Sequence, residues 1–395
     1  MDEKVVPYSV GEEVHYGTNI GHIEYIQEQK ERGRYFEMHL KDEPYTKILS
    51  GLKIYELRLY DEKRKNLKEG DVIRFDRLSS DDKDKCFYTK VKRLKRYDSF
   101  SLLYDASKTK EDPISMYRCG SPKNITKKSF LKRMETYYPL EKQKEHGVVA
   151  IQLEVIYSPE TENNIKSALC RANQRRPMTY SLDFNTWNSF SEEYFKAICL
   201  AEVAHRNVLR KMSDIDFICH PVEVASIVHD ILYRGEFPVI QIYNRAIAAA
   251  ALHDVVEDTS YTLEDIDEVF GESICELVAE ETENKRRTDR PEDTWRIRKA
   301  EFLEKLSKAS DFARAITLAD KLSNMRDMRV DYKELGEELW KKFNNNNKED
   351  HAWYYKSVVE ELGKPNKERD YIVGIEISET EEYKELKRLV SEIFD

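Results

Sequence analysis

Residues 252–259 read Leu-His-Asp-Val-Val-Glu-Asp-Thr, and this stretch decides how the C-terminal half of the chain is interpreted. It continues an alanine-rich run, and the apolar spacing predicts one helix over Ala246–Val256 that carries His253 and Asp254. Small side chains on this helix allow neighbouring helices to approach closely. The pattern therefore predicts a buried helix with an imidazole and a carboxylate at one end.

Two more residues of the same half, His220 and Asp320, complete a set of two imidazoles and two carboxylates with His253 and Asp254. Mixed nitrogen and oxygen ligands of this kind suit Mn²⁺, Fe²⁺ or Zn²⁺ better than Ca²⁺. The sequence predicts that these four side chains bind one divalent metal ion.

Two carboxylates follow the His-Asp pair. Residues four apart share a helix face, so Glu257 is expected one turn beyond His253 and Asp258 one turn beyond Asp254. Carboxylates next to a metal can orient or deprotonate water. We interpret Glu257 and Asp258 as catalytic candidates, with a helix-capping or solvated role as the alternative.

Three further polar residues are candidates for substrate binding. Asn324 is expected one helical turn beyond Asp320, where its amide could hold a sugar or a base. Arg210 and Lys211 precede His220 and supply the cations that a phosphorylated substrate needs.

The two halves of the chain differ in their patterns and predict a multi-domain α+β protein. Before residue 158, short β-rich runs separated by turns predict a small barrel or half-open sheet, interrupted by helices near Pro44–Ser50 and Lys127–Met134. The predicted strands are Tyr35–Leu40, Ile54–Leu59, Asp71–Phe75, Cys86–Val91 and Val148–Ile156.

From about residue 187 the apolar spacing is helical throughout and predicts an all-α bundle. The predicted helices are Phe190–Leu209, Val222–Tyr233, Tyr243–Val256, Leu263–Phe270, Ser273–Glu281, Thr294–Leu306, Phe312–Met328 and His351–Leu362. The charge-dense segment Glu280–Arg298 is interpreted as a solvated face or loop. We expect an unassigned extension over 1–33, the sheet domain over 34–158, a linker over 159–186 and the helical domain over 187–395.

Composition excludes several classes of protein. Of the 395 residues, 35% are charged, and there is no apolar run of about 18 residues, so a transmembrane helix is not expected. The first residues lack the apolar core of a secretory signal. The six cysteines are dispersed without a Cys-x-x-Cys pair, which argues against a disulfide framework and favours a cytoplasmic protein.

The helical half resembles the HD-domain phosphohydrolases, specifically the alarmone hydrolase branch of RelA/SpoT enzymes and small stand-alone hydrolases. The matching stretches include 204–205, 210–211, 217–225, 252–259, 262–271 and 318–325. The resemblance implies one Mn²⁺ ion and removal of pyrophosphate from the 3′ position of (p)ppGpp. It places the metal ligands at His220, His253, Asp254 and Asp320, the water-activating pair at Glu257 and Asp258, and nucleotide contacts at Arg210, Lys211 and Asn324.

The sequence departs from this branch in two places. The stretch from His220 to His253 is longer than usual, with 236–242 as the expected insertion, and residues 214–217 replace the usual Gly-Glu-Pro-Tyr. Both changes are near the expected base site. The substrate alternatives therefore stay open: an adenine alarmone, another nucleotide such as NADPH or a dNTP, or an RNA end. A non-enzymatic nucleotide- or RNA-binding regulator is the third reading.

The sheet half resembles the ASCH domain, a PUA-related β-barrel, through residues 51–58, Gly-Leu-Lys-Ile-Tyr-Glu-Leu-Arg. Relatives that act as amidohydrolases use a Thr where Glu56 stands here, so that activity is not expected. Residues 41–97 hold 17 Lys or Arg against 11 Asp or Glu and interleave aromatic residues such as Tyr55, Tyr60 and Phe87. This composition fits RNA or nucleotide binding, and a charged barrel surface over an aromatic core is the open alternative. The candidate ligand residues are Lys53, Glu56 and Arg58.

Overall fold

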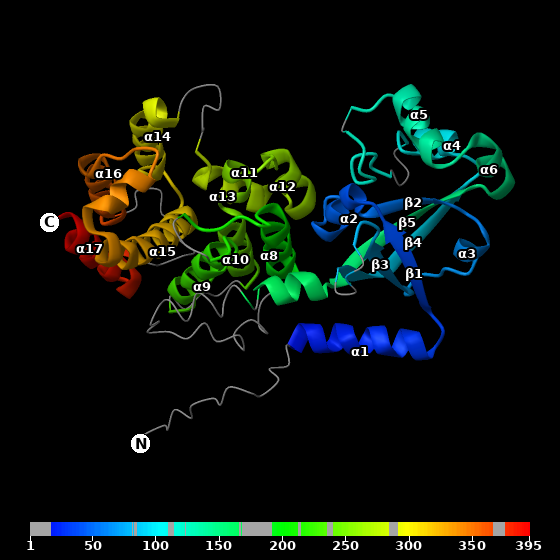
Figure 1. Cartoon of the computed structure of the whole chain (residues 1–395), viewed down its shortest axis with the longest axis horizontal. Helices are drawn as coiled ribbons and strands as arrows, with labels where there is room; N and C mark the ends of the chain where they lie inside the picture. The colour runs from blue at the N-terminus through cyan, green and yellow to red at the C-terminus, as the bar shows by residue number, and fades with distance from the viewer. Residues whose placement is uncertain are drawn as a thin grey trace, which may run out of the picture.

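A computed structural model of the chain describes residues 17–80, 82, 85–109, 114–122, 124–165, 167, 192–211, 215–234, 240–283, 291–365 and 376–395. Among them, no helix combines the length and the apolar character needed to cross a membrane. The described chain divides into a sheet with flanking helices and a bundle of helices (Figure 1).

The first half contains one five-stranded sheet in the order β1-β3-β4-β5-β2. β1 pairs in parallel with β3, and the other neighbouring strands are antiparallel. Register shifts in β4 mark bulges, which bend and twist a strand. The prediction of a half-open sheet is confirmed, and all five predicted strands are present: β1 (Tyr35–Leu40), β2 (Tyr55–Leu59), β3 (Val72–Arg77), β4 (Cys86–Tyr97) and β5 (Val148–Tyr157).

Helices flank this sheet, and two of them were predicted: α2 (Asp42–Leu49) and α5 (Lys127–Tyr137). Four others lack a clear apolar stripe in the sequence or are too short to give one, namely α1 (Gly17–Glu31), α3 (Glu62–Lys65), α4 (Phe100–Ala106) and α6 (Leu140–His146). Among the described side chains of α1, Ile26 and Gln29 are the buried ones. Because so few side chains of α1 are buried, its sequence lacks an apolar stripe from which the helix could have been predicted.

The second half is helical, as predicted. Its elements are α8 (Glu192–Ala204), α9 (Cys219–Arg234), α10 (Ile240–Leu252), α11 (Val255–Asp258), α12 (Leu263–Phe270), α13 (Glu272–Glu281), α14 (Pro291–Leu306), α15 (Asp311–Leu335), the 3-10 helix η2 (Gly336–Lys342), α16 (Lys348–Leu362), the 3-10 helix η3 (Ile377–Glu379) and α17 (Glu381–Phe394). Gly271 and Gly336 end α12 and α15 with positive φ angles of 82° and 55°.

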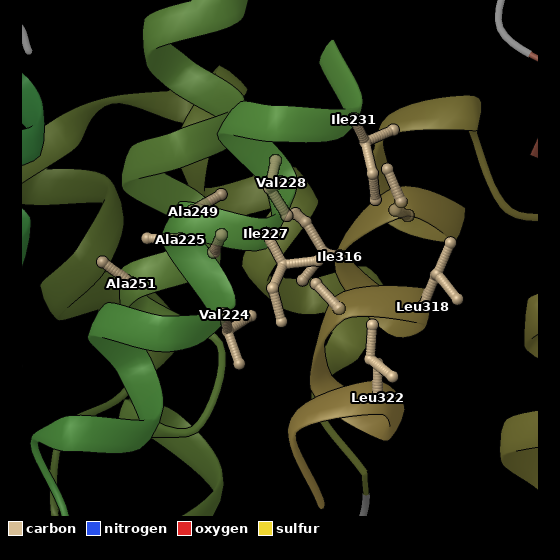
Figure 2. Close-up of a cluster of buried hydrophobic side chains, with 14 of the residues drawn as sticks. Val224, Ala225, Ile227, Val228, Ile231, Ala249, Ala251, Ile316, Leu318 and Leu322 are labelled. Atoms are coloured by element: carbon tan, nitrogen blue, oxygen red, sulfur yellow. The ribbon is translucent and has the colours of Figure 1, made fainter. Parts of the chain in front are cut away.

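Helix α9 packs against both α10 and α15, and this contact forms the core of the helical half. Figure 2 shows Ile227 and Val228 of α9 pointing toward Ile316 of α15, with Ala249 and Ala251 of α10 on the other side of α9. All five side chains are buried. The alanines let α10 lie close to its neighbours, as the sequence predicted.

One helix differs from its prediction at an important point. Helix α10 ends at Leu252, residues 253–254 form a turn, and the separate α11 begins at Val255. The helix predicted through Val256 is therefore interrupted at the His-Asp pair. The backbone N–H of Asp258 still donates to the carbonyl of Asp254 at 2.9 Å, so the one-turn relation between these two residues survives.

Some boundary predictions concern residues outside the described set. These are 1–16 of the predicted extension, most of the predicted linker (168–186) and 236–239 of the expected insertion. Residues 159–165, the first part of the predicted linker, are helical.

Gly147 connects α6 to β5 in a backbone conformation that requires glycine. Its φ of 69° and ψ of −171° lie in a region that only glycine occupies readily, and an added Cβ would lie 3.0 Å from the Tyr97 carbonyl oxygen. We expect Gly147→Ala to lower the free energy of unfolding by about 1 to 3 kcal/mol in urea denaturation. Gly21→Ala is the control, because no atom lies within 4 Å of that added Cβ and alanine favours a helix. Equal stability of the two variants would contradict the argument.

Candidate active site

The four side chains predicted as metal ligands converge on one point. His220 Nε2 lies 3.2 Å from His253 Nε2, 3.4 Å from an Asp254 carboxylate oxygen and 3.1 Å from Asp320 Oδ1. His253 Nε2 lies 3.1 Å from the same Asp254 oxygen. These residues come from the start of α9, the turn after α10 and the middle of α15. The bundle thus brings together residues separated by a hundred positions in the sequence.

The hydrogen bonds on the far side of each imidazole fix the ring orientation. His253 Nδ1 lies 2.8 Å from the Ala250 carbonyl oxygen, which only accepts, so Nδ1 is the donor. His220 Nδ1 lies 2.9 Å from Ser323 Oγ, and the Ser323 hydroxyl donates to Glu223 at 2.7 Å, so this Nδ1 also donates. In the neutral form of each ring, the two Nε2 atoms therefore face each other with their lone pairs available for a cation.

The electrostatics of the cluster favour a positive charge at its centre. Burial alone would lower the pKa of His253, but the carboxylates of Asp254 and Asp320 raise it well above its ordinary value. Burial would raise the pKa of Asp320, and the Lys321 ammonium beside it holds that pKa well below its usual range. His220, His253 and Asp320 offer ligand atoms within 4.8 Å of one another, a buried group that could bind a metal ion. The donor set fits a divalent cation.

The two catalytic candidates lie in the same pocket, which has a volume of about 280 Å³. Glu257 and Asp258 line it from α11, and Asp258 is exposed to solvent. The Glu257 carboxylate accepts the backbone N–H of Glu283 at 3.2 Å, so the segment after α13 positions it. Both residues thus share one pocket with His220 and His253.

The predicted substrate residues also line this pocket. Asn324 donates to Asp320 Oδ1 at 2.6 Å, which confirms that they share one face of α15. Arg210 donates to Asn324 Oδ1 at 3.1 Å and forms an ion pair with Asp327. Lys211 is exposed at the rim of the pocket. Residues 214–217 replace the tetrapeptide that is usual in the family. Phe217 lies against the rings of both His205 and His220, and Asp214 is outside the described residues.

Sequence reasoning missed much of the remaining pocket wall. Aromatic rings form one end, and Lys299 and Lys321 add two cations; the lining includes Trp295, Phe302, Phe343, His351, Tyr354 and Tyr355. Glu283 is buried and accepts from Arg298 at 3.1 Å and from Lys299 at 2.6 Å. The interpretation of 280–298 as a solvated face is therefore wrong for these residues.

Glu281 is the most informative of the missed groups. It follows Ile274 and Val278 on the buried side of α13, and this helical spacing was the available signal. Both carboxyl oxygens lie within 3.0 Å of the Thr317 hydroxyl. Burial raises the pKa of Glu281 to about 8, although nearby Lys321 opposes the shift. At neutral pH this pocket residue keeps its proton.

A second polar cluster lies in the sheet half, where Lys53, Glu56 and Arg58 meet as predicted. The Glu56 carboxylate is 2.6 Å from Lys53 Nζ and 2.8 Å from Arg58 Nε, and Glu56 is only 4% exposed. Burial would raise the pKa of Glu56, but the two cations lower it overall, so the carboxylate is ionised. Burial raises the pKa of the adjacent Cys119 thiol to about 12, which excludes a thiolate nucleophile.

These three residues line a pocket of about 240 Å³, called here the Lys53 pocket. Its wall contains Phe130, Tyr137 and Tyr138, and its basic residues include Lys41, Lys47 and Arg133. A buried ion triad beside aromatic rings and cations has the composition of a polar ligand site.

Comparison with known proteins agrees with this geometry. Residues 197–347 match the HD domain and residues 38–157 match the ASCH domain. A Drosophila melanogaster protein named guanosine-3′,5′-bis(diphosphate) 3′-pyrophosphohydrolase MESH1 is 33% identical over 141 residues, which are 35% of this chain and 72% of the relative. The Homo sapiens protein of the same name is also 33% identical, with the same coverage.

The chain belongs to the HD-domain hydrolase family of these MESH1 proteins. The identity concerns the helical half only, and the ASCH domain precedes it. A solved protein of Listeria monocytogenes EGD-e is 29% identical and covers 45% of this chain and 95% of its own, with a TM-score of 0.34. In this HD-domain chain, the buried His-His-Asp group is a candidate metal site.

Glu281 gives the HD-domain half a distinctive pH dependence. Between the ordinary pKa of 4.5 and about 8, the folded state keeps a proton that the unfolded state has lost. Stability therefore falls as pH rises through this window, by up to about 1.4 kcal/mol per pH unit. We expect Glu281→Gln, which cannot ionise, to reduce this slope in denaturation at pH 5 to about 8. The exposed Glu276→Gln on the same helix should keep it, and a native slope in Glu281→Gln would refute the assignment.

Proposed function

We propose that the protein is a Mn²⁺-dependent hydrolase that removes the 3′-pyrophosphate from guanosine alarmones of the (p)ppGpp type. The observation that carries this proposal is the facing pair of Nε2 atoms, His220 and His253, with the carboxylates of Asp254 and Asp320 around them. The activity for which the MESH1 relatives are named supports the same reaction.

In this proposal those four residues hold the Mn²⁺ ion. When bound, the ion supplies positive charge that makes water more acidic and draws electrons from a phosphoryl group. Glu257 and Asp258 line the pocket beside it and accept a proton from the attacking water. The phosphorus–oxygen bond at the ribose 3′ position breaks, the phosphorus keeps the water's hydroxyl, and the 3′ oxygen gains the proton.

The other side chains of the pocket bind and orient the nucleotide. Arg210, Lys211 and Lys299 contribute positive charge for the phosphates of the substrate. The aromatic end, which includes Trp295 and His351, offers faces on which a base can stack. Asn324, held between Arg210 and Asp320, orients the sugar or base.

Mutation of the metal ligands tests this function. We expect the native protein with Mn²⁺ to release pyrophosphate from ppGpp. We expect His253→Ala and Asp320→Ala to lose more than about 1,000-fold in kcat/KM together with their bound metal, because each holds the cation. Glu257→Gln should keep the metal and lose about 100- to 10,000-fold in kcat, as expected for a general base.

His229→Ala is the matched control, because His229 lies on the same helix as His220 and contacts Tyr243 outside the pocket. Its activity should stay within about threefold of the native protein, because the His229 side chain, although only 12% exposed, does not line the pocket. Full activity in Asp320→Ala would contradict the ligand assignment. Turnover of ppApp, NADPH or a dNTP in preference to ppGpp would keep the hydrolase and replace the substrate.

For the Lys53 pocket we propose binding of an unpaired nucleotide of RNA. The ion triad offers both donors and an acceptor to the edge of a base, and the nearby rings allow stacking. Lys41, Lys47 and Arg133 are available for the flanking phosphates. The size of the pocket suits one nucleotide rather than a duplex.

Fluorescence anisotropy with a single-stranded RNA oligonucleotide tests this second function on the full chain. We expect Arg133→Ala to weaken binding and to reduce the slope of log K against log salt by about 0.7, the value for one lost phosphate contact. Lys356→Ala, which removes a cation bonded to Asp395 in the other half, should leave the slope unchanged. An unchanged slope in Arg133→Ala would refute the pocket as the RNA site.

A further inference from the structure

Helix α2 of the sheet half packs directly against the HD-domain half. Its Tyr45, Ile48 and Leu49 are buried in the core beneath the sheet, and Val203 of α8 belongs to the same buried cluster. Figure 1 shows α2 on the side of the sheet that faces α8 and α12. The two halves therefore share packed apolar side chains.

The turn after α2 contacts the segment that follows the catalytic candidates. Tyr261 lines one cleft together with Thr46 and Lys47 of α2 and with Leu52 of the turn that follows. A Cβ at Gly51, where φ is 78°, would lie 3.5 Å from a methyl carbon of Val269. Farther along the interface, Arg118 Nε lies 3.9 Å from a carboxylate oxygen of Glu268. The turn after α2 thus lies against α12 and shares a cleft with the loop that comes after Asp258.

This contact lies close in the sequence to candidate site residues of both halves. On the sheet side, Lys53 follows two residues later, and its backbone N–H donates to the Lys47 carbonyl of α2 at 2.8 Å. On the other side, the Tyr261 backbone N–H donates to Thr259 Oγ1 at 3.2 Å, and Thr259 Oγ1 donates to the Val255 carbonyl at 2.6 Å. Tyr261 is therefore tied to α11, which carries Glu257 and Asp258.

A cleft of about 490 Å³ lies between the halves beside this contact. Ser260, Tyr261 and Asp265 line it from the HD-domain side. Its lining on the sheet side includes four residues that also line the Lys53 pocket, namely Glu43, Lys47, Gly120 and Ser121. Because these four residues line both spaces, a displacement of this shared wall changes the shape of the cleft in which Tyr261 lies.

We propose that Tyr261 couples the Lys53 pocket to the metal site, so that the state of the pocket sets the position of Glu257 and Asp258 and hence the rate of hydrolysis. The inference rests on the proposed function of both sites. The ligand regulates from the sheet half, and the coupling passes from Lys53 through the α2 turn to Tyr261 and α11. Because such coupling is reciprocal, metal binding must also alter the backbone around Lys53.

Hydrogen exchange of the full chain, read by mass spectrometry with and without Mn²⁺ alone, tests this reciprocity. In the native protein we expect Mn²⁺ to slow amide exchange over 253–261 and also over 50–56. An effect of about fivefold or more at 50–56 corresponds to the lower end of usual coupling. In Tyr261→Phe and Tyr261→Ala, the first segment should still be slowed and the second should not.

Tyr383→Phe is the matched control, because its buried phenol donates to the Val359 carbonyl at 3.1 Å, away from the interface. It should respond as the native protein does. Slowing over 253–261 without any change over 50–56 in the native protein would overturn the coupling and leave the metal site intact. Slowing at 50–56 that persists in both Tyr261 variants would refute Tyr261 as the route. No response in either segment would refute metal binding itself, and the coupling with it.

Discussion

Two imidazole nitrogens 3.2 Å apart are the constraint on which the site depends. Each Nδ1 is committed as a donor on its far side, to a carbonyl for His253 and to the Ser323 hydroxyl for His220. The facing Nε2 atoms and the nearby carboxylates need a positive charge between them. The buried group formed by His220, His253 and Asp320 could bind a metal ion that supplies this charge.

The rest of the bundle maintains this arrangement. The alanines of α10 allow α9 to lie close to it on one side, and the packing of α9 against α15 on the other side brings His220 within 3.1 Å of Asp320. The Ser323–Glu223 bond joins α9 to α15, and Arg326 extends the network by bonding Glu223 and Glu385 of α17. Through these bonds α17 helps to hold the orientation of the His220 ring.

Much of this was readable from the sequence, because strands and long helices have their own periodicities and the His-Asp pair lies in a recognisable stretch. The turn at residues 253–254 could not be predicted, because the helical apolar pattern continues through it. Only the geometry of the four candidate ligands requires the helix to break there. The hydrogen bond between Ser323 and Glu223 could not be predicted either, because a single sequence does not show that α9 packs against α15. The burial of Glu281 could have been predicted from its helical spacing with Ile274 and Val278, but its charged sequence neighbours favoured a solvated surface. The contact between Gly51 and Val269 joins two surfaces that no periodicity relates.

The most direct test of the central claim is anomalous diffraction at the manganese edge from a crystal grown with Mn²⁺. The account predicts one peak between His220 Nε2 and His253 Nε2, at bonding distance from both and from the carboxylates of Asp254 and Asp320. A map without a peak there, or with the ion bound elsewhere in the pocket, would contradict it.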